Sequence, residues 1–201
     1  MTPLSLLLAS ANPGKLREYR ELAGDPHVQL ELIPHFNELA QFDEAAPTFA
    51  ENSAGKALHY SQFTTDLVVA DDSGLVVPAL EGAPGVHSAR YAGPSATDAH
   101  RIQKLLREMR GKEGDQRRAR FICVVTLARS GRALAITSDF TEGTLTLEPR
   151  GKHGFGYDPI FFSPQLGRTF AEATQQEKNH YSHRGRAFRK VLELLSSSQI
   201  P

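Results

Sequence analysis

Cysteine is scarce in this sequence, and the scarcity excludes two structural features. Cys123 is the only cysteine among 201 residues. An internal disulfide needs two cysteines and a metal site built from thiolates needs several, so neither is available to this chain. Cys123 lies in the apolar run 121–127, which favours a buried, unreactive thiol over the alternative of a nucleophile.

An excess of charge of either sign is also absent. The 23 Lys and Arg residues balance the 23 Asp and Glu residues, so the formal net charge is zero. Without a global electric field, a polyanionic ligand has to be held by locally placed cations, backbone amides or a metal ion. Binding to a nucleic-acid backbone depends on a surplus of basic residues, which argues against such a partner. A compact anionic ligand fits the charge balance better than a polymer.

Long hydrophobic runs are missing as well. The apolar run nearest the N-terminus, residues 4–11, is interrupted by Ser5 and Ser10 and has no basic flank. It is too short and too polar for a signal peptide or a membrane span, so we expect a cytoplasmic protein with no membrane partner. The composition, 40% hydrophobic and 23% charged, is typical of a globular protein and favours one domain over residues 1–201.

Helices and strands are predicted to alternate in the first half of the chain, with a hairpin and a further strand in the second half. Strands are predicted at residues 4–11, 28–33, 67–70, 120–128, 133–140 and 142–147. Helices are predicted after the first strand, at 48–63, around 102–109 and after Ser182. This order favours a mixed sheet with helices on its faces. The charged connector 112–118 is expected to be a solvated loop.

The first candidate binding motif is the turn between the first predicted strand and the first predicted helix, residues 10–15 (SANPGK). Free backbone amides at such a strand–turn–helix junction are suited to phosphate, and Lys15 adds a cation. The turn is not a Walker A loop, because it lacks the glycine spacing and the Ser or Thr after the lysine. A tight turn without a ligand is the alternative interpretation.

The second motif is the run Asp71-Asp72-Ser73-Gly74, which directly follows the predicted strand 67–70. Two adjacent carboxylates at the end of a strand can hold Mg²⁺ and orient a water molecule, because hard cations prefer oxygen ligands. The alternative is an Asp-rich turn with no ligand.

The third motif is the segment 154–159 (GFGYDP) in a glycine-rich loop. Glycines allow the backbone to approach a ligand closely, and the ring of Phe155 or Tyr157 can stack on a base. The alternative is a glycine turn whose aromatic side chains fill the core.

The fourth motif joins Lys178 and Asn179 to Ser182, His183 and Arg184 at the start of the last predicted helix. A helix N-terminus and cationic side chains are suited to anions and to acceptors such as a keto oxygen. His183 can also be an ordinary surface histidine, since the chain has eight.

Together these motifs resemble the inosine triphosphate pyrophosphatase family. The matching stretches, in order over nearly the whole chain, are SANPGKLREYRELAG at 10–24, TFAENSAGKA at 48–57, ADDSGLVVPALEGAPGVHSARYAG at 70–93, GFGYDPIFF at 154–162 and TFAEATQQEKNHYSHRGRAF at 169–188. The resemblance implies an α/β fold with an elongated mixed β-sheet and flanking helices, in two lobes with the active-site cleft between them. It also implies a homodimer that uses Mg²⁺ to hydrolyse ITP, dITP and XTP to the monophosphate and pyrophosphate.

The resemblance further implies roles for individual residues. Asp72 matches the proton acceptor and Glu44 and Asp72 match the Mg²⁺ ligands, while Asp43 and Asp71 stay open as metal ligands. Arg184 is expected to select the purine through its 6-keto oxygen, because a guanidinium only donates hydrogen bonds. The full set of expected substrate contacts is Ser10, Ala11, Asn12, Pro13, Gly14, Lys15, Lys56, Ser73, Arg90, Phe155, Gly156, Tyr157, Asp158, Lys178, His183 and Arg184.

Three other functions stay open at this point. One is a pyrophosphatase for a different nucleotide set, such as modified pyrimidines. Another is a nucleic-acid-binding protein that uses Arg117, Arg118, Arg120 and the basic last helix, although the zero net charge and the carboxylate pair argue against it. The third is a nucleotide sensor without turnover, against which the presence of Asp72 and Glu44 counts.

Overall fold

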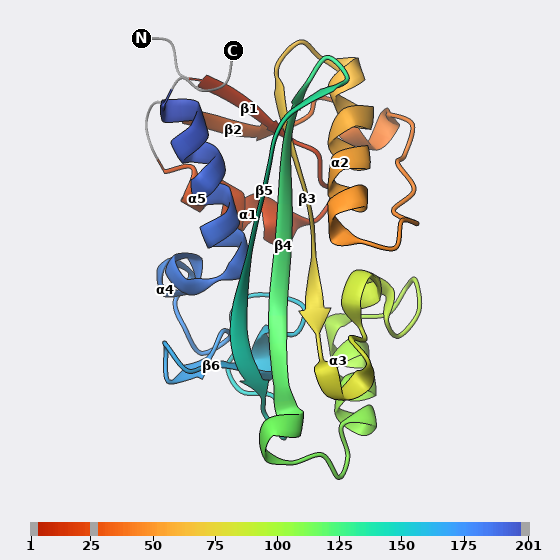
Figure 1. Cartoon of the computed structure of the whole chain (residues 1–201), viewed down its shortest axis with the longest axis vertical. Coiled ribbons are helices and arrows are strands. Elements are labelled where there is room, and N and C mark those ends of the chain that lie inside the picture. The colour runs from red at the N-terminus through yellow and green to blue at the C-terminus, as the bar shows by residue number, and fades with distance from the viewer. Residues whose placement is uncertain (1–3, 25–27, 198–201) are drawn as a thin grey trace. The chain divides into compact units, whose positions relative to one another are not determined.

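A seven-stranded mixed β-sheet organises the chain, and helices flank it (Figure 1). The computed structural model describes residues 4–24 and 28–197. The strand order is β2-β1-β3-β4-β5-β6-β7. The strands are β1 (Leu4–Leu8), β2 (Val28–Leu32), β3 (Leu67–Val76), β4 (Arg118–Arg129), β5 (Arg132–Leu145), β6 (Phe161–Ser163) and β7 (Arg168–Thr169). β1 pairs in parallel with β2 and β3, whereas β6 pairs antiparallel with β5 and β7. The predicted α/β fold with a mixed sheet is confirmed.

The helices begin where local capping signals place them. They are α1 (Pro13–Leu22), α2 (Phe49–Tyr60), α3 (Asp98–Glu108), α4 (Gln175–Tyr181) and α5 (His183–Ser196). Thr48 caps α2 by accepting from the Glu51 backbone amide, as the sequence predicts. The helix α4 was not predicted, although Thr174 and Glu177 form a capping box at its start. Within the described residues, none of the helices is both long and apolar enough to span a membrane.

Several strand boundaries differ from the prediction. The first strand, expected to reach residue 11, ends at Leu8. The expected end at Ala70 is wrong, because β3 continues through Asp71 and Asp72 to Val76. Its parallel partner β1 ends at Leu8, but β4 is also a neighbour of β3 in the sheet, and this neighbour allows the strand to continue through a polar stretch. The separate strand expected at 142–147 is also wrong, because β5 extends without a break to Leu145.

The chain divides into two compact units. The first comprises Met1–Asp72, Cys123–Asp139 and Arg184–Pro201, and the second comprises Ser73–Ile122 and Phe140–His183. The strands β3, β4 and β5 therefore each contribute residues to both units.

The first unit has a separate core on each face of its part of the sheet. Successive side chains of a strand point to opposite faces. Leu6 and Leu8 accordingly pack with Phe188 of α5 and with α1, whereas Leu7 packs with Tyr60 of α2. The helices α1 and α5 therefore cover one face and α2 covers the other (Figure 1).

The second unit packs α3 and the strands β6 and β7 around one core, which includes Leu105, Phe161 and Phe170. Arg117 belongs to the charged connector 112–118, which is expected to be a solvated loop, yet Arg117 is buried. The guanidinium donates to the carbonyl oxygens of Leu145 at 2.7 Å and of Met109 at 3.3 Å, among others. The prediction of a fully solvated connector is therefore wrong at Arg117, since the last carbonyls of a helix need donors that sequence alone does not identify.

Candidate functional site

Asp71 and Asp72 lie inside β3, just past the last residue that pairs with β1. The final paired residues are Leu8 of β1 and Val69 of β3. Because adjacent residues of a strand face opposite sides, the two carboxylates have different surroundings. Asp71 is fully buried and Asp72 is 6% exposed.

Asp71 is an anchor for two cations of the first unit. Its Oδ1 lies 3.0 Å from the Lys15 ammonium, and its Oδ2 accepts from Nε and Nη2 of Arg184 at 3.3 Å. Burial raises the pKa of Asp71, but Lys15, Arg184 and Lys56 outweigh that effect and hold the pKa well below its usual value. The carboxylate is therefore ionised and engaged by cations through both oxygens, so Asp71 is poorly suited to act as a base.

The thiol of Cys123 completes the surroundings of Asp71. The Sγ atom is fully buried and donates to Oδ2 of Asp71 at 3.7 Å. Burial and the nearby Asp71 charge raise the pKa of Cys123 far above its usual value, so the thiol stays protonated. The prediction of a buried thiol is confirmed.

Asp72 has the opposite electrostatic character. Burial raises its pKa above the ordinary value and repulsion from Glu44 adds to the rise, while Lys15 and Lys56 oppose it. Its Oδ2 accepts a hydrogen bond of 3.0 Å from Nδ2 of Asn52. A carboxylate of raised pKa is a stronger base than an ordinary one, and proton transfer at neutral pH favours such a group.

Asn52 is a residue of the site that the sequence analysis missed. Besides Asp72, its side chain binds both backbone groups of Ala46, accepting from the amide at 3.0 Å and donating to the carbonyl at 3.2 Å. It thus fastens the loop that carries Glu44 to α2 and to Asp72. The available signal was its position in the first turn of a capped helix, inside the matching stretch TFAEN.

Glu44 and Lys56 form an ion pair in the first unit. The Lys56 side chain is 8% exposed and that of Glu44 is 35% exposed. Burial lowers the pKa of Lys56, but Glu44, Asp71 and Asp72 raise it by more, so the side chain stays an ammonium ion. Asp43, the open alternative to Glu44, is exposed. The structure therefore brings Glu44, and not Asp43, together with a cation of the candidate site.

Arg184 also occupies a buried position that the sequence analysis did not anticipate. Its Nη1 lies 2.5 Å from Oε2 of Glu18 on α1, and both side chains are at most 3% exposed. With the contacts to Asp71, the guanidinium links α1, β3 and α5. Glu18 was missed because nothing in its local sequence distinguishes it from a solvated helix residue.

Among the described residues of the first unit, four carboxyl side chains therefore lie with three basic ones. The carboxyl groups are those of Glu18, Glu44, Asp71 and Asp72, and the basic side chains are Lys15, Lys56 and Arg184.

The turn 10–15 has local hydrogen bonds that the sequence analysis did not foresee. Oδ1 of Asn12 accepts from the backbone amides of Gly14 at 2.9 Å and Lys15 at 3.2 Å, and the Asn12 amide donates to Oγ of Ser10 at 3.1 Å. The expectation of free amides is therefore wrong for these three groups. The Asn at the N-cap satisfies the amides of Gly14 and Lys15, and the Ser10 hydroxyl satisfies that of Asn12. Ala11, Asn12 and Pro13 are exposed.

In the second unit, Asp158 joins the glycine-rich loop to α4. Its Oδ2 accepts from the Phe155 amide at 2.9 Å and from the Lys178 ammonium, which also lies 4.8 Å from the centre of the Phe155 ring. Gly154 has a φ of +74°, and a Cβ there would meet Oδ2 of Asp158 at 2.0 Å, so only glycine fits. Phe155 is half-buried.

Two other predicted contacts in this unit are core residues. Tyr157 is 3% exposed and its hydroxyl donates to the Ser88 carbonyl at 3.0 Å, so its ring is not placed to stack on a base. His183 is buried and stacks on Phe121 with 4.7 Å between ring centres, so the surface-histidine alternative is wrong. Of the remaining predicted contacts, Ser73 is half-buried in β3 and Arg90 is exposed at the end of the 3₁₀ segment Gly85–Arg90. The Gly156 amide donates to Asp98 at 2.7 Å.

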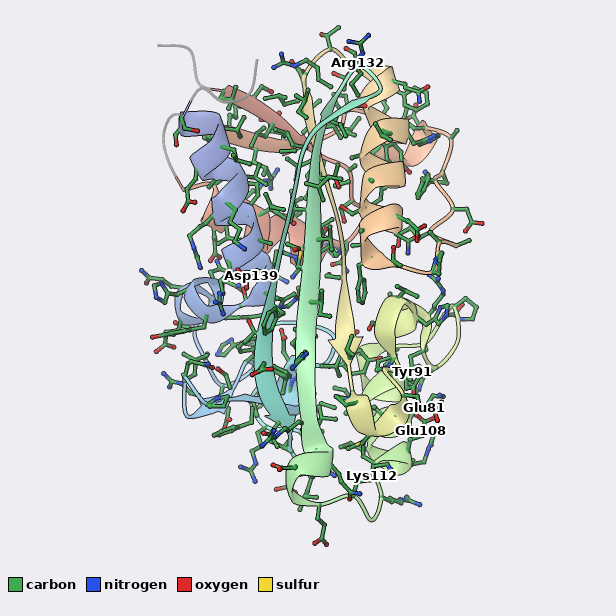
Figure 2. All side chains as sticks on the ribbon, viewed as in Figure 1. Glu81, Tyr91, Glu108, Lys112, Arg132 and Asp139 are labelled. Carbon is green, nitrogen blue, oxygen red and sulfur yellow. The ribbon has the colours of Figure 1, made fainter. Side chains whose placement is uncertain are left out.

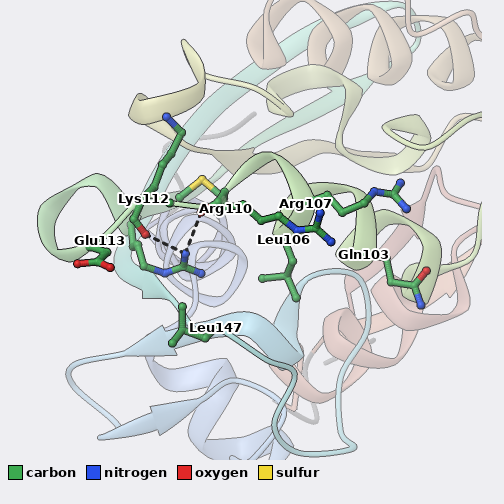
Figure 3. Close-up of a pocket in the computed structure, with 10 residues that line it drawn as sticks. Gln103, Leu106, Arg107, Arg110, Lys112, Glu113 and Leu147 are labelled. Carbon is green, nitrogen blue, oxygen red and sulfur yellow. Dashed lines mark hydrogen bonds between the residues drawn. The ribbon is translucent and has the colours of Figure 1, made fainter.

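A cavity of about 590 Å³ lies in another part of the second unit (Figure 3). Its lining includes Leu106, Arg110, Lys112 and Leu147 and contains no predicted site residue. Elsewhere, the Tyr91 hydroxyl donates to Glu108 in the second unit, and Asp139 pairs with Lys190 in the first. Figure 2 labels Tyr91, Glu108 and Asp139. Neither the cavity nor these side-chain pairs resemble the group of carboxylates and cations around Asp71 and Asp72.

These observations define an α/β protein with an open mixed sheet and, in its first unit, a buried cluster of carboxylates and cations around β3. The family model of the Ham1 family matches residues 6–194. The chain belongs to the Ham1 family. The family resemblance seen in the sequence is therefore confirmed.

Known relatives are similar over almost the whole chain. A dITP/XTP pyrophosphatase of Geobacillus kaustophilus (strain HTA426) is 45% identical over 188 residues, which cover 94% of this chain and 92% of that protein. One of Desulforamulus reducens is 42% identical and covers 98% of both chains. The solved structure of a HAM1 protein from Coxiella burnetii has a TM-score of 0.85 at 43% identity and covers 97% of this chain and 100% of that chain. That of the Staphylococcus aureus Ham1 protein has a TM-score of 0.84 at 33% identity, covering 96% and 98%.

Proposed function

We propose that this chain hydrolyses deaminated purine nucleoside triphosphates, namely ITP, dITP and XTP, to the nucleoside monophosphate and pyrophosphate. The observation that carries the proposal is Asp72, a nearly buried carboxylate of raised pKa that interacts with Lys15 and Lys56. A general base beside two cations is suited to the attack of water on the phosphoanhydride chain of a nucleoside triphosphate. The names of the relatives, dITP/XTP pyrophosphatases, support the substrate class.

In this proposal Asp72 accepts the proton of the attacking water. Asn52 holds one carboxylate oxygen of Asp72 through its side-chain amide, which fixes the orientation of the base. Lys15 and Lys56 offset negative charge on the phosphates, and the products are the nucleoside monophosphate and pyrophosphate. Lys15 is held in place for this by Asp71.

Glu44 and Asp72 are proposed to hold Mg²⁺. Among the residues that the structure describes, no three His, Cys, Asp or Glu side chains form a group that could bind a metal ion. Two carboxylates nevertheless fit Mg²⁺, which proteins often bind through one or two carboxylates together with substrate phosphates and water. When bound, Mg²⁺ polarises phosphoryl oxygens. It would also offset negative charge of the carboxylates and of the triphosphate.

The resemblance assigns recognition of the purine base of the substrate to Phe155 and Arg184. Phe155 offers a half-buried ring for stacking. Arg184 is proposed to favour the 6-keto oxygen of hypoxanthine or xanthine over the amino group of adenine. The proposal extends to a cytoplasmic homodimer formed by one domain over residues 1–201, with neither nucleic acid nor a membrane as a partner. The zero formal net charge supports the absence of a nucleic-acid partner.

The proposed function is tested by measuring pyrophosphate release from ITP, dITP, XTP and the four common ribonucleoside triphosphates, each with and without Mg²⁺. We expect rapid release from the three deaminated purine nucleotides only when Mg²⁺ is present. Faster release of pyrophosphate from pyrimidine nucleotides than from ITP, dITP and XTP would contradict the proposal. It would favour a pyrophosphatase for pyrimidine nucleotides. Binding without release from any nucleotide would leave only the sensor.

Exchange of Glu44 for glutamine is expected to raise the Mg²⁺ concentration that gives half-maximal activity by about tenfold, because a neutral amide is a weaker ligand for a hard cation. The measurement is a Mg²⁺ titration of ITP hydrolysis at saturating ITP. The control is Asp43→Asn, which removes the same charge from the neighbouring exposed position and should leave the titration nearly unchanged. A shift in Asp43→Asn instead of Glu44→Gln would move the metal ligand to Asp43.

A further inference from the structure

The Lys56 ammonium lies directly on the carboxylate that is proposed to bind the metal. Nζ of Lys56 donates to Oε1 of Glu44, from the last turns of α2 to the loop of residues 34–47. An ammonium ion and a divalent cation in contact with the same carboxylate oxygen repel each other strongly, since little water separates them. The contact seen here therefore competes electrostatically with Mg²⁺ for that oxygen.

We propose that Glu44 exchanges the Lys56 ammonium for Mg²⁺, so that Lys56 becomes available to phosphate only when Glu44 holds the metal. This inference rests on the proposed role of Glu44 as a metal ligand. It assigns Lys56 a second task, as an internal cation that neutralises Glu44 before the metal is bound.

The different exposure of the two partners supports an exchange. The Lys56 side chain is 8% exposed and belongs to α2, whereas the Glu44 side chain is 35% exposed and belongs to a loop. Glu44 can therefore turn toward a metal ion without disturbing the core. Asn52 holds Ala46, two residues along the loop, and so limits how far Glu44 can move.

Lys56 also has a reason to stay in the cluster after Glu44 turns away. Asp71 and Asp72 attract its charge as well, so the released ammonium remains beside the proposed base. The exchange leaves a cation where a phosphate group has to be neutralised, and it does so only in the metal-bound protein. Binding of the metal would thus favour binding of the phosphate, and binding of the phosphate would favour binding of the metal.

The test is metal binding to the full chain without any nucleotide. Free Mn²⁺, a probe for the Mg²⁺ site, is measured by electron paramagnetic resonance during titration. We expect Lys56→Met to bind Mn²⁺ about tenfold more tightly than the unaltered chain, because the competing charge is gone. Lys56→Arg keeps the charge and should show no gain. In the double variant Glu44→Gln/Lys56→Met the gain should disappear.

The matched control is Lys15→Met. Lys15 also acts electrostatically on Asp72, but its contact is with Asp71 and not with Glu44. An equal gain in Lys15→Met would show a general field effect and overturn the exchange. Equal Mn²⁺ affinity in Lys56→Met and the unaltered chain, a gain that persists in the double variant, or the absence of Mn²⁺ binding in all of them would also overturn it. No nucleotide is present in these titrations, so their results do not depend on whether the chain hydrolyses ITP. Failure of the exchange and failure of the proposed activity can therefore be told apart.

Discussion

Replacing Asp72 with asparagine is expected to lower kcat for ITP hydrolysis by on the order of a hundredfold or more. The amide has nearly the same shape but cannot accept the proton of the attacking water, and it contributes no charge to the metal site. The amide oxygen can still accept from Asn52, which now binds Oδ2 of Asp72, so the fold should be retained. The measurement is the steady-state rate of pyrophosphate release at saturating ITP and Mg²⁺.

The neighbouring carboxylate supplies the comparison for Asp72. Asp71→Asn removes the anchor of Lys15 and Arg184, so it should reduce stability more than Asp72→Asn does. Binding of ITP to Asp72→Asn should persist in weakened form, since Lys15 and Lys56 are intact. Turnover close to that of the unaltered chain in Asp72→Asn would exclude Asp72 as the base.

Arg184→Met is expected to lower the free energy of unfolding by about 3–5 kcal/mol, the usual cost of removing one partner of a buried ion pair. The carboxylates of Glu18 and Asp71, at 2% and 0% exposure, would lose the guanidinium that neutralises them. Urea unfolding followed by circular dichroism measures the change. The control is Arg186→Met on the same helix, where the half-exposed arginine pairs with Asp139 at 3.4 Å and should matter by less than about 1 kcal/mol. Equal losses in the two variants would exclude the anchoring role.

A second substitution of Arg184 tests whether this residue selects the purine base of the substrate. Arg184→Lys keeps a positive charge for the two buried carboxylates but loses the planar set of donors. If Arg184 also binds the 6-keto oxygen, kcat/KM for ITP should fall far more than kcat/KM for ATP, and the ratio of the two should narrow. GTP also carries a 6-keto group, so its exclusion has to arise elsewhere. An equal fall for ITP, ATP and GTP would limit Arg184 to holding the buried carboxylates.

The helix starts and the hairpin were predictable because their signals are local. Thr48 with Glu51 opens α2, and Ser130-Gly131 separates β4 from β5, as capping and turn chemistry require. The same kind of signal at Thr174 and Glu177 was overlooked, and α4 with it. The end of β3 could not be predicted, since a strand continues as long as a neighbouring strand pairs with it.

The fold class, the family and the residue types of the site can be read from the amino-acid sequence alone, because they follow from hydrophobic periodicity and from motifs that are contiguous in the chain. The family motif already assigns the proton acceptor to Asp72, whereas the anchoring role of Asp71 and the opposite pKa shifts of the two aspartates emerge only from the fold. Asp71 and Asp72 are identical in type, but opposite faces of β3 give one Lys15 and Arg184 and the other Asn52. Burial and charge pairing depend on residues far apart in the chain, and these decide the pKa of each carboxylate.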